Sequence, residues 1–149
     1  MSDNEKYLQI VDSTPLVSID LILEDLQERV LLGMRNNRPA QGFWFVPGGS
    51  IRKNERLCDA FKRISSFELG TEIALTNAAL VGVFEHIYED NYLGIHGINT
   101  HYVVLAYKVK IKDDFQFKPD NQHSEMKWWF KEQLMNEPKV HQNTKAYFV

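Results

Sequence analysis

The amino-acid sequence predicts one α/β sandwich domain over residues 1–149. Several short segments alternate apolar and polar residues, which is typical of β-strands, and a central stretch has apolar residues at helical spacing. The chain of 149 residues suits a single domain, and it contains no repeat, low-complexity tract or Pro/Gly/Ser-rich linker. Strands and a helix that alternate within one domain predict helices packed on a sheet.

The first predicted strand covers residues 17–24, and its alternation places Asp20 on the face opposite to the core. Further strands are predicted over residues 29–34, 79–88, 101–111 and 127–130. The helix is predicted from an apolar stripe that consists of Leu57, Ala60, Phe61 and Ile64. Short helical stretches follow the last strand, and Pro138 interrupts them.

Composition is ordinary for a globular protein, and it limits the function classes. The formal net charge of −3 provides no basic field for nucleic acid, so phosphate recognition would depend on a few arginines. Cys58 is the one cysteine, which excludes an intramolecular disulfide. The polar N-terminus lacks the apolar core of a signal peptide, and no apolar run approaches membrane-spanning length. We therefore expect a cytoplasmic protein with no membrane partner.

The segment GGSIRKNERLCDAFKRISSFELG, residues 48–70, carries the strongest functional signal. Its glycines and charged residues Gly49, Glu55, Arg63, Glu68 and Gly70 have the spacing of a Nudix box, which it resembles. Ile64 and Phe67 stand where that pattern has two glutamates. Positions 64, 67 and 68 share one helix face, where three carboxylates would gather divalent metal. With Glu68 alone on that face, the box favours a single cation that neutralises a leaving diphosphate.

The resemblance extends along most of the chain, from about residue 13 to the end. The matching segments are STPLVSIDLIL, LLGMR, NNRPAQGFWFVPGG, FEHIYEDN, THYVVLAY, PDNQH and TKAYFV. Together they are similar to the GDP-mannose mannosyl hydrolases, an atypical Nudix family with the same depletion of glutamates. The resemblance implies a mixed-sheet α/β/α fold, a homodimer and a place in GDP-sugar metabolism for surface polysaccharide. It also implies Mg²⁺-dependent hydrolysis of GDP-mannose to GDP and mannose with inversion, and GDP-glucose stays open as a second substrate.

The resemblance also assigns roles to individual residues. The implied metal ligands are the Gly48 carbonyl, Glu68 and Gln122, an all-oxygen set that suits Mg²⁺, with Mn²⁺ as a substitute. The implied catalytic residues are His123, Arg35, Tyr102 and Asp20. His123 is the general base, Arg35 and Tyr102 would stabilise the departing GDP, and Asp20 would lie near the mannose. The residues implied in holding phosphate or sugar are Arg35, Arg63, His86, Tyr88, Tyr102 and Asp20. The local sequence also allows each residue to be explained without a function. Arg35 could be a solvated strand end, and His123 could lie in an exposed loop.

Two departures from the family pattern bear on the substrate. Ser50 occupies a position where the family carries an arginine, and Arg52 is the alternative source of that charge. The region of residues 93–99 is one residue longer than the pattern. Two other functions therefore stay open. One is a conventional Nudix pyrophosphohydrolase that gives GMP and a sugar 1-phosphate, and the other is a nucleotide-sugar binding protein that has lost catalysis.

Overall fold

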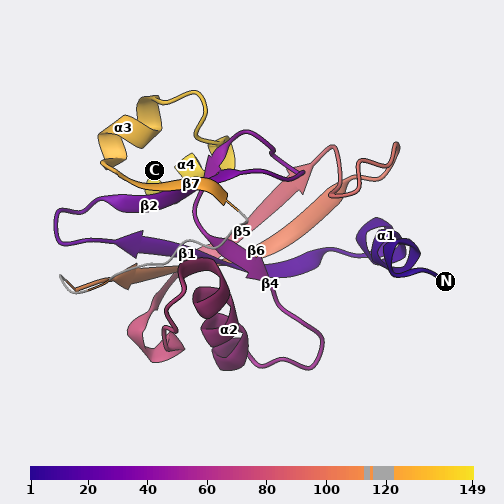
Figure 1. Ribbon diagram of the computed structural model, residues 1–149, viewed down its shortest axis with the longest axis horizontal. Coiled ribbons are helices and arrows are strands. Elements are labelled where there is room, and N and C mark those ends of the chain that lie inside the picture. The colour runs from indigo at the N-terminus through magenta and orange to yellow at the C-terminus, as the bar shows by residue number, and fades with distance from the viewer. Residues whose placement is uncertain (113–114, 116–122) are drawn as a thin grey trace.

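The computed structural model describes residues 1–112, 115 and 123–149, and its centre is a mixed β-sheet (Figure 1). The order along the sheet is β3 (Trp44–Phe45), β2 (Val30–Arg35), β1 (Leu16–Glu24), β6 (Thr100–Lys110) and β5 (Ala79–Tyr88). In addition, β4 (Gly48–Ser50) pairs with β1, and β7 (His123–Trp129) pairs with β2. β1 and β6 run parallel, whereas the other named pairs are antiparallel.

Helices cover both faces of this sheet. Figure 1 shows α2 (Leu57–Leu69) on one side, and α3 (Lys131–Asn136) and α4 (Gln142–Lys145) on the other. The 3-10 turn η2 (Ala146–Phe148) follows α4 in the chain. Two clusters of buried side chains correspond to these two interfaces. The expected α/β/α sandwich with a mixed sheet is therefore confirmed.

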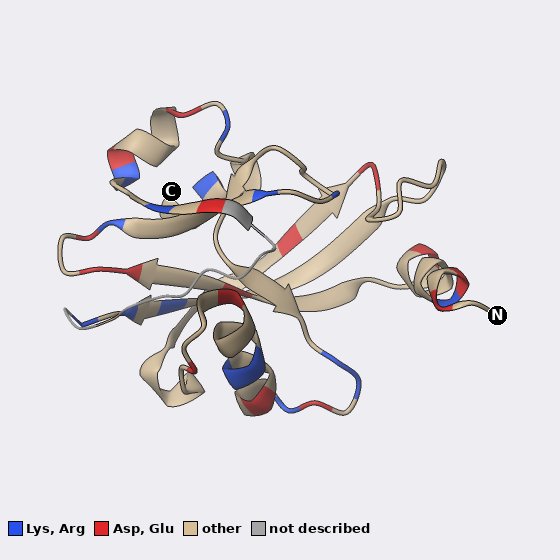
Figure 2. Ribbon diagram, in the orientation of Figure 1, with Lys and Arg blue, Asp and Glu red and all other residues tan. Residues whose placement is uncertain are grey.

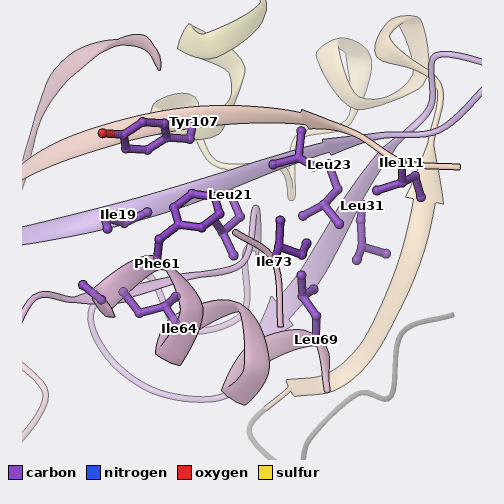
Figure 3. Close-up of a cluster of buried hydrophobic side chains, with 12 residues drawn as sticks. Ile19, Leu21, Leu23, Leu31, Phe61, Ile64, Leu69, Ile73, Tyr107 and Ile111 are labelled. Carbon is purple, nitrogen blue, oxygen red and sulfur yellow. The ribbon is translucent and has the colours of Figure 1, made fainter. Parts of the chain in front are cut away.

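Strand β1 contributes to both clusters because both of its faces are covered. Ile19, Leu21 and Leu23 face α2, where Phe61 and Ile64 pack against them (Figure 3). Ile22 belongs to the second cluster. Asp20 shares the parity of Ile22 along the strand, so it lies on the face away from α2, as its position in the sequence predicts.

Helix α2 buries a shorter stripe than the sequence predicts. Ala60, Phe61 and Ile64 are buried, but Leu57 is 41% exposed because it is the first residue of the helix and lies outside the packed turns. The helix ends at Gly70, whose φ of 69° is the left-handed conformation that glycine adopts without a steric penalty. The box glycine thus also terminates the helix.

Some elements were not predicted. Helix α1 (Asp3–Ser13) begins with a capping box in which Ser2 and Glu5 satisfy each other's backbone N–H groups, a signal that the N-terminal sequence does contain. β3 and β4 are too short for a periodic pattern. β7 begins at His123, four residues before the predicted strand at residue 127, since pairing with β2 supplies its backbone hydrogen bonds.

None of the helices in the described ranges is long and apolar enough to cross a membrane. Acidic and basic side chains are interspersed on the visible helices and loops (Figure 2). The 3-10 turn η1 (Leu75–Asn77) connects α2 to β5.

Candidate active site

A cavity of about 420 Å³ opens among β1, β2, β4, β5, β6 and α2. It brings together the described residues that the sequence analysis assigned to substrate or metal, which are Asp20, Arg35, Gly48, Arg63, Glu68, His86, Tyr88 and Tyr102. Gln122 lies outside the described residues. For His123 the structure describes the backbone, which begins β7 and pairs with Arg35. The assigned roles stay predictions, but the residues come from distant parts of the chain to one cavity.

Arg35 is fixed at the end of β2 by several hydrogen bonds. Its backbone N–H donates to the Phe43 carbonyl at 2.9 Å, and its side-chain Nε donates to the Pro39 carbonyl at 2.8 Å. The guanidinium carbon lies 5.7 Å from the centre of the Phe45 ring. A guanidinium held in this way at a cavity wall can meet phosphate oxygens with little loss of side-chain entropy.

Arg63 links the box helix to the loop that precedes it. Its Nε and Nη2 donate to the two carboxylate oxygens of Glu55 at 2.7 and 2.9 Å, and Nη2 also donates to the Ser50 carbonyl at 2.8 Å. The backbone N–H of Arg52 donates to Glu55 at 2.9 Å. These bonds from Arg63, and then from Arg52, lower the pKa of Glu55 to about 2. Arg63 therefore braces the loop while it lines the cavity, whereas the Arg52 side chain is exposed.

This brace predicts an acid-sensitive contribution to stability. Because the folded-state pKa of Glu55 is below its usual 4.5, the ionised pair stabilises the fold above about pH 4.5 and loses this contribution as pH falls toward 2. Glu55→Gln should therefore lower the free energy of unfolding at pH 7 and flatten its decrease between pH 4.5 and 2. Denaturant unfolding across this range measures the effect, with exposed Glu72→Gln as the control. If the free energy of unfolding falls equally with pH in the wild type and in Glu55→Gln, the prediction is wrong.

The two glycines before the box helix lie where close packing leaves little room for a side chain. A Cβ at Gly48 would lie 2.3 Å from Oδ1 of Asp20 and 2.6 Å from the Ile19 carbonyl oxygen, so a side chain there would displace Asp20. A Cβ at Gly49 would lie 3.2 Å from the Ile64 side chain. β4 therefore lies directly against both β1 and α2.

The box positions without glutamate have different surroundings. Ile64 is 1% exposed and belongs to the core cluster under α2. Phe67 is 52% exposed at the cavity, and Glu68 is only 6% exposed. One face of α2 thus presents to the cavity a core aliphatic residue, an exposed aromatic residue and a single buried carboxylate.

The residues at this face fit a hard divalent cation. The described residues contain no cluster of three or more His, Cys, Asp or Glu side chains, so a cation here would need carbonyl, amide or substrate oxygens beside Glu68. Gly48, whose carbonyl is a candidate ligand, lines the same cavity as Glu68. Mixed carboxylate and carbonyl oxygens are the donors that Mg²⁺ and Mn²⁺ prefer.

Asp20 and His86 line the cavity, and both contact Tyr147, a residue outside the lining that the sequence analysis did not select. The Tyr147 hydroxyl donates a short hydrogen bond to Asp20 Oδ2 and lies 3.4 Å from His86 Nε2. Burial raises the pKa of Asp20 to about 7, although Tyr147 and Arg35 oppose the shift. Burial, with His141 nearby, lowers the pKa of His86 to about 4, so its imidazole is neutral at pH 7.

Aromatic side chains build the remaining wall. The rings of Tyr88 and Tyr102 meet edge to face at 6.2 Å, and burial raises the pKa of each phenol to about 12. Both hydroxyls therefore stay protonated and can donate hydrogen bonds to anionic oxygens. His141, which the sequence analysis also did not select, stacks on Phe45 with ring centres 4.8 Å apart. Its contact depends on the return of the chain after α3, for which the local sequence contains no signal.

The relatives of the chain agree with this architecture. Residues 14–149 match the model of the NUDIX domain. The chain belongs to the Nudix family. Nudix hydrolases generally use divalent metals such as Mg²⁺. Low-salt glycan biosynthesis protein Agl8 of Haloferax volcanii is 41% identical over 125 residues, which cover 83% of this chain and 76% of Agl8.

Solved Nudix structures share the fold. The MutT protein of Methanosarcina mazei superposes with a TM-score of 0.73 at 17% identity, covering 91% of this chain and 92% of that one. The NUDIX domain of Shewanella oneidensis NrtR, solved with ADP ribose, has a TM-score of 0.67 at 20% identity, and the match covers 99% of this chain and 97% of that domain. The MutT NUDIX hydrolase of Burkholderia pseudomallei has a TM-score of 0.68 at 26% identity, and the match covers 91% of this chain and 96% of that one.

Proposed function

We propose that this Nudix hydrolase cleaves GDP-mannose to GDP and mannose, with water attacking the anomeric carbon and inverting it. The observation that carries the proposal is the small number of carboxylates that the box helix brings to the cavity. Ile64 is part of the core, Phe67 is exposed, and Glu68 is the carboxylate that α2 directs to the cavity. A site with so few carboxylates is poorly suited to hold several cations around an attacked phosphorus.

The rest of the cavity supports attack at carbon. Arg35 provides a fixed cation, and the protonated phenols of Tyr88 and Tyr102 provide donors near it. These groups can stabilise the charge that develops on a departing diphosphate. Gly48, Glu68 and Gln122 would hold Mg²⁺, which when bound neutralises the same leaving group.

The proposed base is His123. Its backbone pairs with that of Arg35 at the start of β7, and Arg35 lines the cavity, which supports a place for His123 near the substrate. A neutral imidazole there can take a proton from water, while Asp20 and His86 bind the sugar hydroxyls. Inversion requires this water to attack the face of the anomeric carbon opposite the leaving diphosphate.

The relatives support a nucleotide-sugar substrate. The NrtR domain was solved with ADP ribose, a nucleoside diphosphate joined to a sugar. Agl8 is described as a glycan biosynthesis protein, and glycan assembly consumes nucleotide sugars. The homodimer and the link to surface polysaccharide belong to the same proposal.

Hydrolysis of GDP-mannose in ¹⁸O-labelled water tests the reaction class. Attack at carbon is expected to leave GDP unlabelled and to place the label on mannose, with the inverted anomer visible by proton NMR before mutarotation. Mass spectrometry of the nucleotide is the decisive measurement, because free mannose can also exchange its anomeric oxygen with water.

Unlabelled mannose incubated in the same water corrects for that exchange. Labelled GMP or labelled sugar 1-phosphate would contradict the proposal and favour the pyrophosphohydrolase. Binding of GDP-mannose without turnover in the presence of Mg²⁺ would favour the binding protein.

A further inference from the structure

Tyr147 joins two cavity side chains that come from β1 and β5, two strands separated by β6 in the sheet. It lies 127 positions after Asp20 in the chain, and its side chain is 8% exposed. The ring packs edge-on against Phe84 with centres 4.7 Å apart and lies 5.9 Å from the centre of the His86 ring. This packing fixes the hydroxyl between Asp20 on β1 and His86 on β5.

The direction of these hydrogen bonds follows from the chemistry of the groups. A phenol has one proton to donate and accepts through its oxygen lone pairs. With Asp20 ionised, the proton of Tyr147 points to Asp20 Oδ2, so His86 Nε2 can approach the hydroxyl oxygen only as a donor. A neutral His86 must then carry its proton on Nε2, which leaves Nδ1 as its acceptor.

The other oxygen of Asp20, Oδ1, lies beside β4. Oδ1 stands close to Gly48, where an added Cβ would be only 2.3 Å away, and both residues line the cavity. Tyr147 therefore holds Oδ2 from behind while Oδ1 stands at the side of β4. A carboxylate held in this way accepts hydrogen bonds through Oδ1, and the hydroxyls of a sugar are suitable donors.

The segment that carries Tyr147 contacts the cavity wall at other points as well. Asn143 on α4 hydrogen-bonds to Tyr88, and His141 stacks on Phe45 with ring centres 4.8 Å apart. The backbone N–H of Asn143 donates to His141 Nδ1 at 3.0 Å, which ties these two contacts together. Residues 141–148 thus form a packed support behind the cavity.

We propose that Tyr147 is a positioning residue for the sugar end of the cavity. Through one hydroxyl it holds the ionised Asp20 carboxylate as an acceptor and, in that state, keeps His86 in the Nε2–H tautomer, so that both groups are set to bind hydroxyls of a polyol. The identity of that polyol as the sugar of a nucleotide sugar rests on the proposed function. The arrangement of Asp20, His86 and Tyr147 does not.

Tyr147→Phe tests the role in binding and turnover, because it removes the hydroxyl and keeps the ring. The loss of a hydrogen bond to a charged group is expected to lower kcat/KM for GDP-mannose roughly 10- to 100-fold. The Kd for GDP, which lacks the sugar, should change by less than about twofold. Tyr107→Phe is the matched control, since Tyr107 is also 8% exposed but packs on Phe61 beneath α2.

Two results would overturn the proposal in this assay. One is wild-type kcat/KM in Tyr147→Phe. The other is an equal loss of GDP affinity, which would indicate general damage to the cavity. Thermal unfolding of both variants shows whether the two substitutions disturb the fold to a similar extent.

The His86 tautomer provides a readout that does not depend on any substrate. Long-range ¹H–¹⁵N NMR of the wild-type protein at pH 8 should show the proton on Nε2, and Tyr147→Phe should shift the ¹⁵N resonances of His86 while those of the exposed His96 stay in place. A proton on Nδ1 in the wild type, or unchanged His86 resonances in the variant, would overturn the proposal. If the wild type fails to hydrolyse GDP-mannose, the proposed function fails and this measurement still decides the role of Tyr147.

Discussion

His123→Gln is expected to hydrolyse GDP-mannose roughly 10² to 10⁴ times more slowly than the wild-type protein, because the variant lacks the proposed base. The backbone of His123 pairs with Arg35, whose side chain is anchored to the Pro39 carbonyl at 2.8 Å at the cavity. A neutral imidazole can accept the proton of water as a general base. Steady-state kinetics measure the loss in kcat, and the acidic limb of the pH–rate profile should change with it.

Binding separates this effect from damage to the site. The affinity for GDP should be nearly unchanged in His123→Gln, since the base acts on water and not on the nucleotide. His96→Gln is the control, because His96 is exposed in the loop between β5 and β6. Wild-type turnover and an unchanged acidic limb in His123→Gln would remove His123 from the mechanism.

Glu68→Gln is expected to weaken Mg²⁺ binding and to slow turnover by roughly 100-fold or more, because a neutral amide replaces an anionic ligand of similar shape. The effect should be large since Glu68 is 6% exposed and is flanked on the same helix face by Ile64 and Phe67, which have no oxygen to offer. Turnover should be measured against Mg²⁺ concentration in both proteins.

A second measurement follows the metal without turnover. Mg²⁺ should raise the melting temperature of the wild-type protein, since a ligand that binds the folded state stabilises it, and should raise that of Glu68→Gln much less. Exposed Glu72→Gln, just after the box helix, controls for the loss of one negative charge. Equal Mg²⁺ affinity and activity in wild type and Glu68→Gln would place the cation elsewhere.

Much of the fold could be predicted from local patterns. The strand expected at residues 79–88 has those bounds in the structure. The strand expected at 17–24 differs by one residue at one end, and those expected at 29–34 and 101–111 are each displaced by one residue at both ends. Period-two alternation marks these strands because neighbouring side chains point to opposite faces. β3 and β4 were missed because two or three residues cannot show a period, and α1 was missed although its capping box stands in the sequence.

The candidate site was predictable to a similar extent. Spacing and resemblance selected residues such as Arg35, Glu68 and His86, and the described ones line one cavity. The same reasoning could not predict which groups each of these side chains contacts. Arg63 was assigned to substrate, which stays a prediction, and the structure adds that its Nε and Nη2 donate to Glu55 and the Ser50 carbonyl.

The sequence by itself determined the family, the helix face at positions 64, 67 and 68, and the side of β1 that carries Asp20, since each depends on residues a few positions apart. Only the tertiary structure decided that Ile64 packs beside Gly49 in the core and that Tyr147 donates to Asp20. Such contacts arise when sheet pairing and the return of the chain after α3 bring remote segments together. Local side-chain periodicity contains no information about which remote segments will meet, so the polar support behind the cavity became visible only in the folded chain.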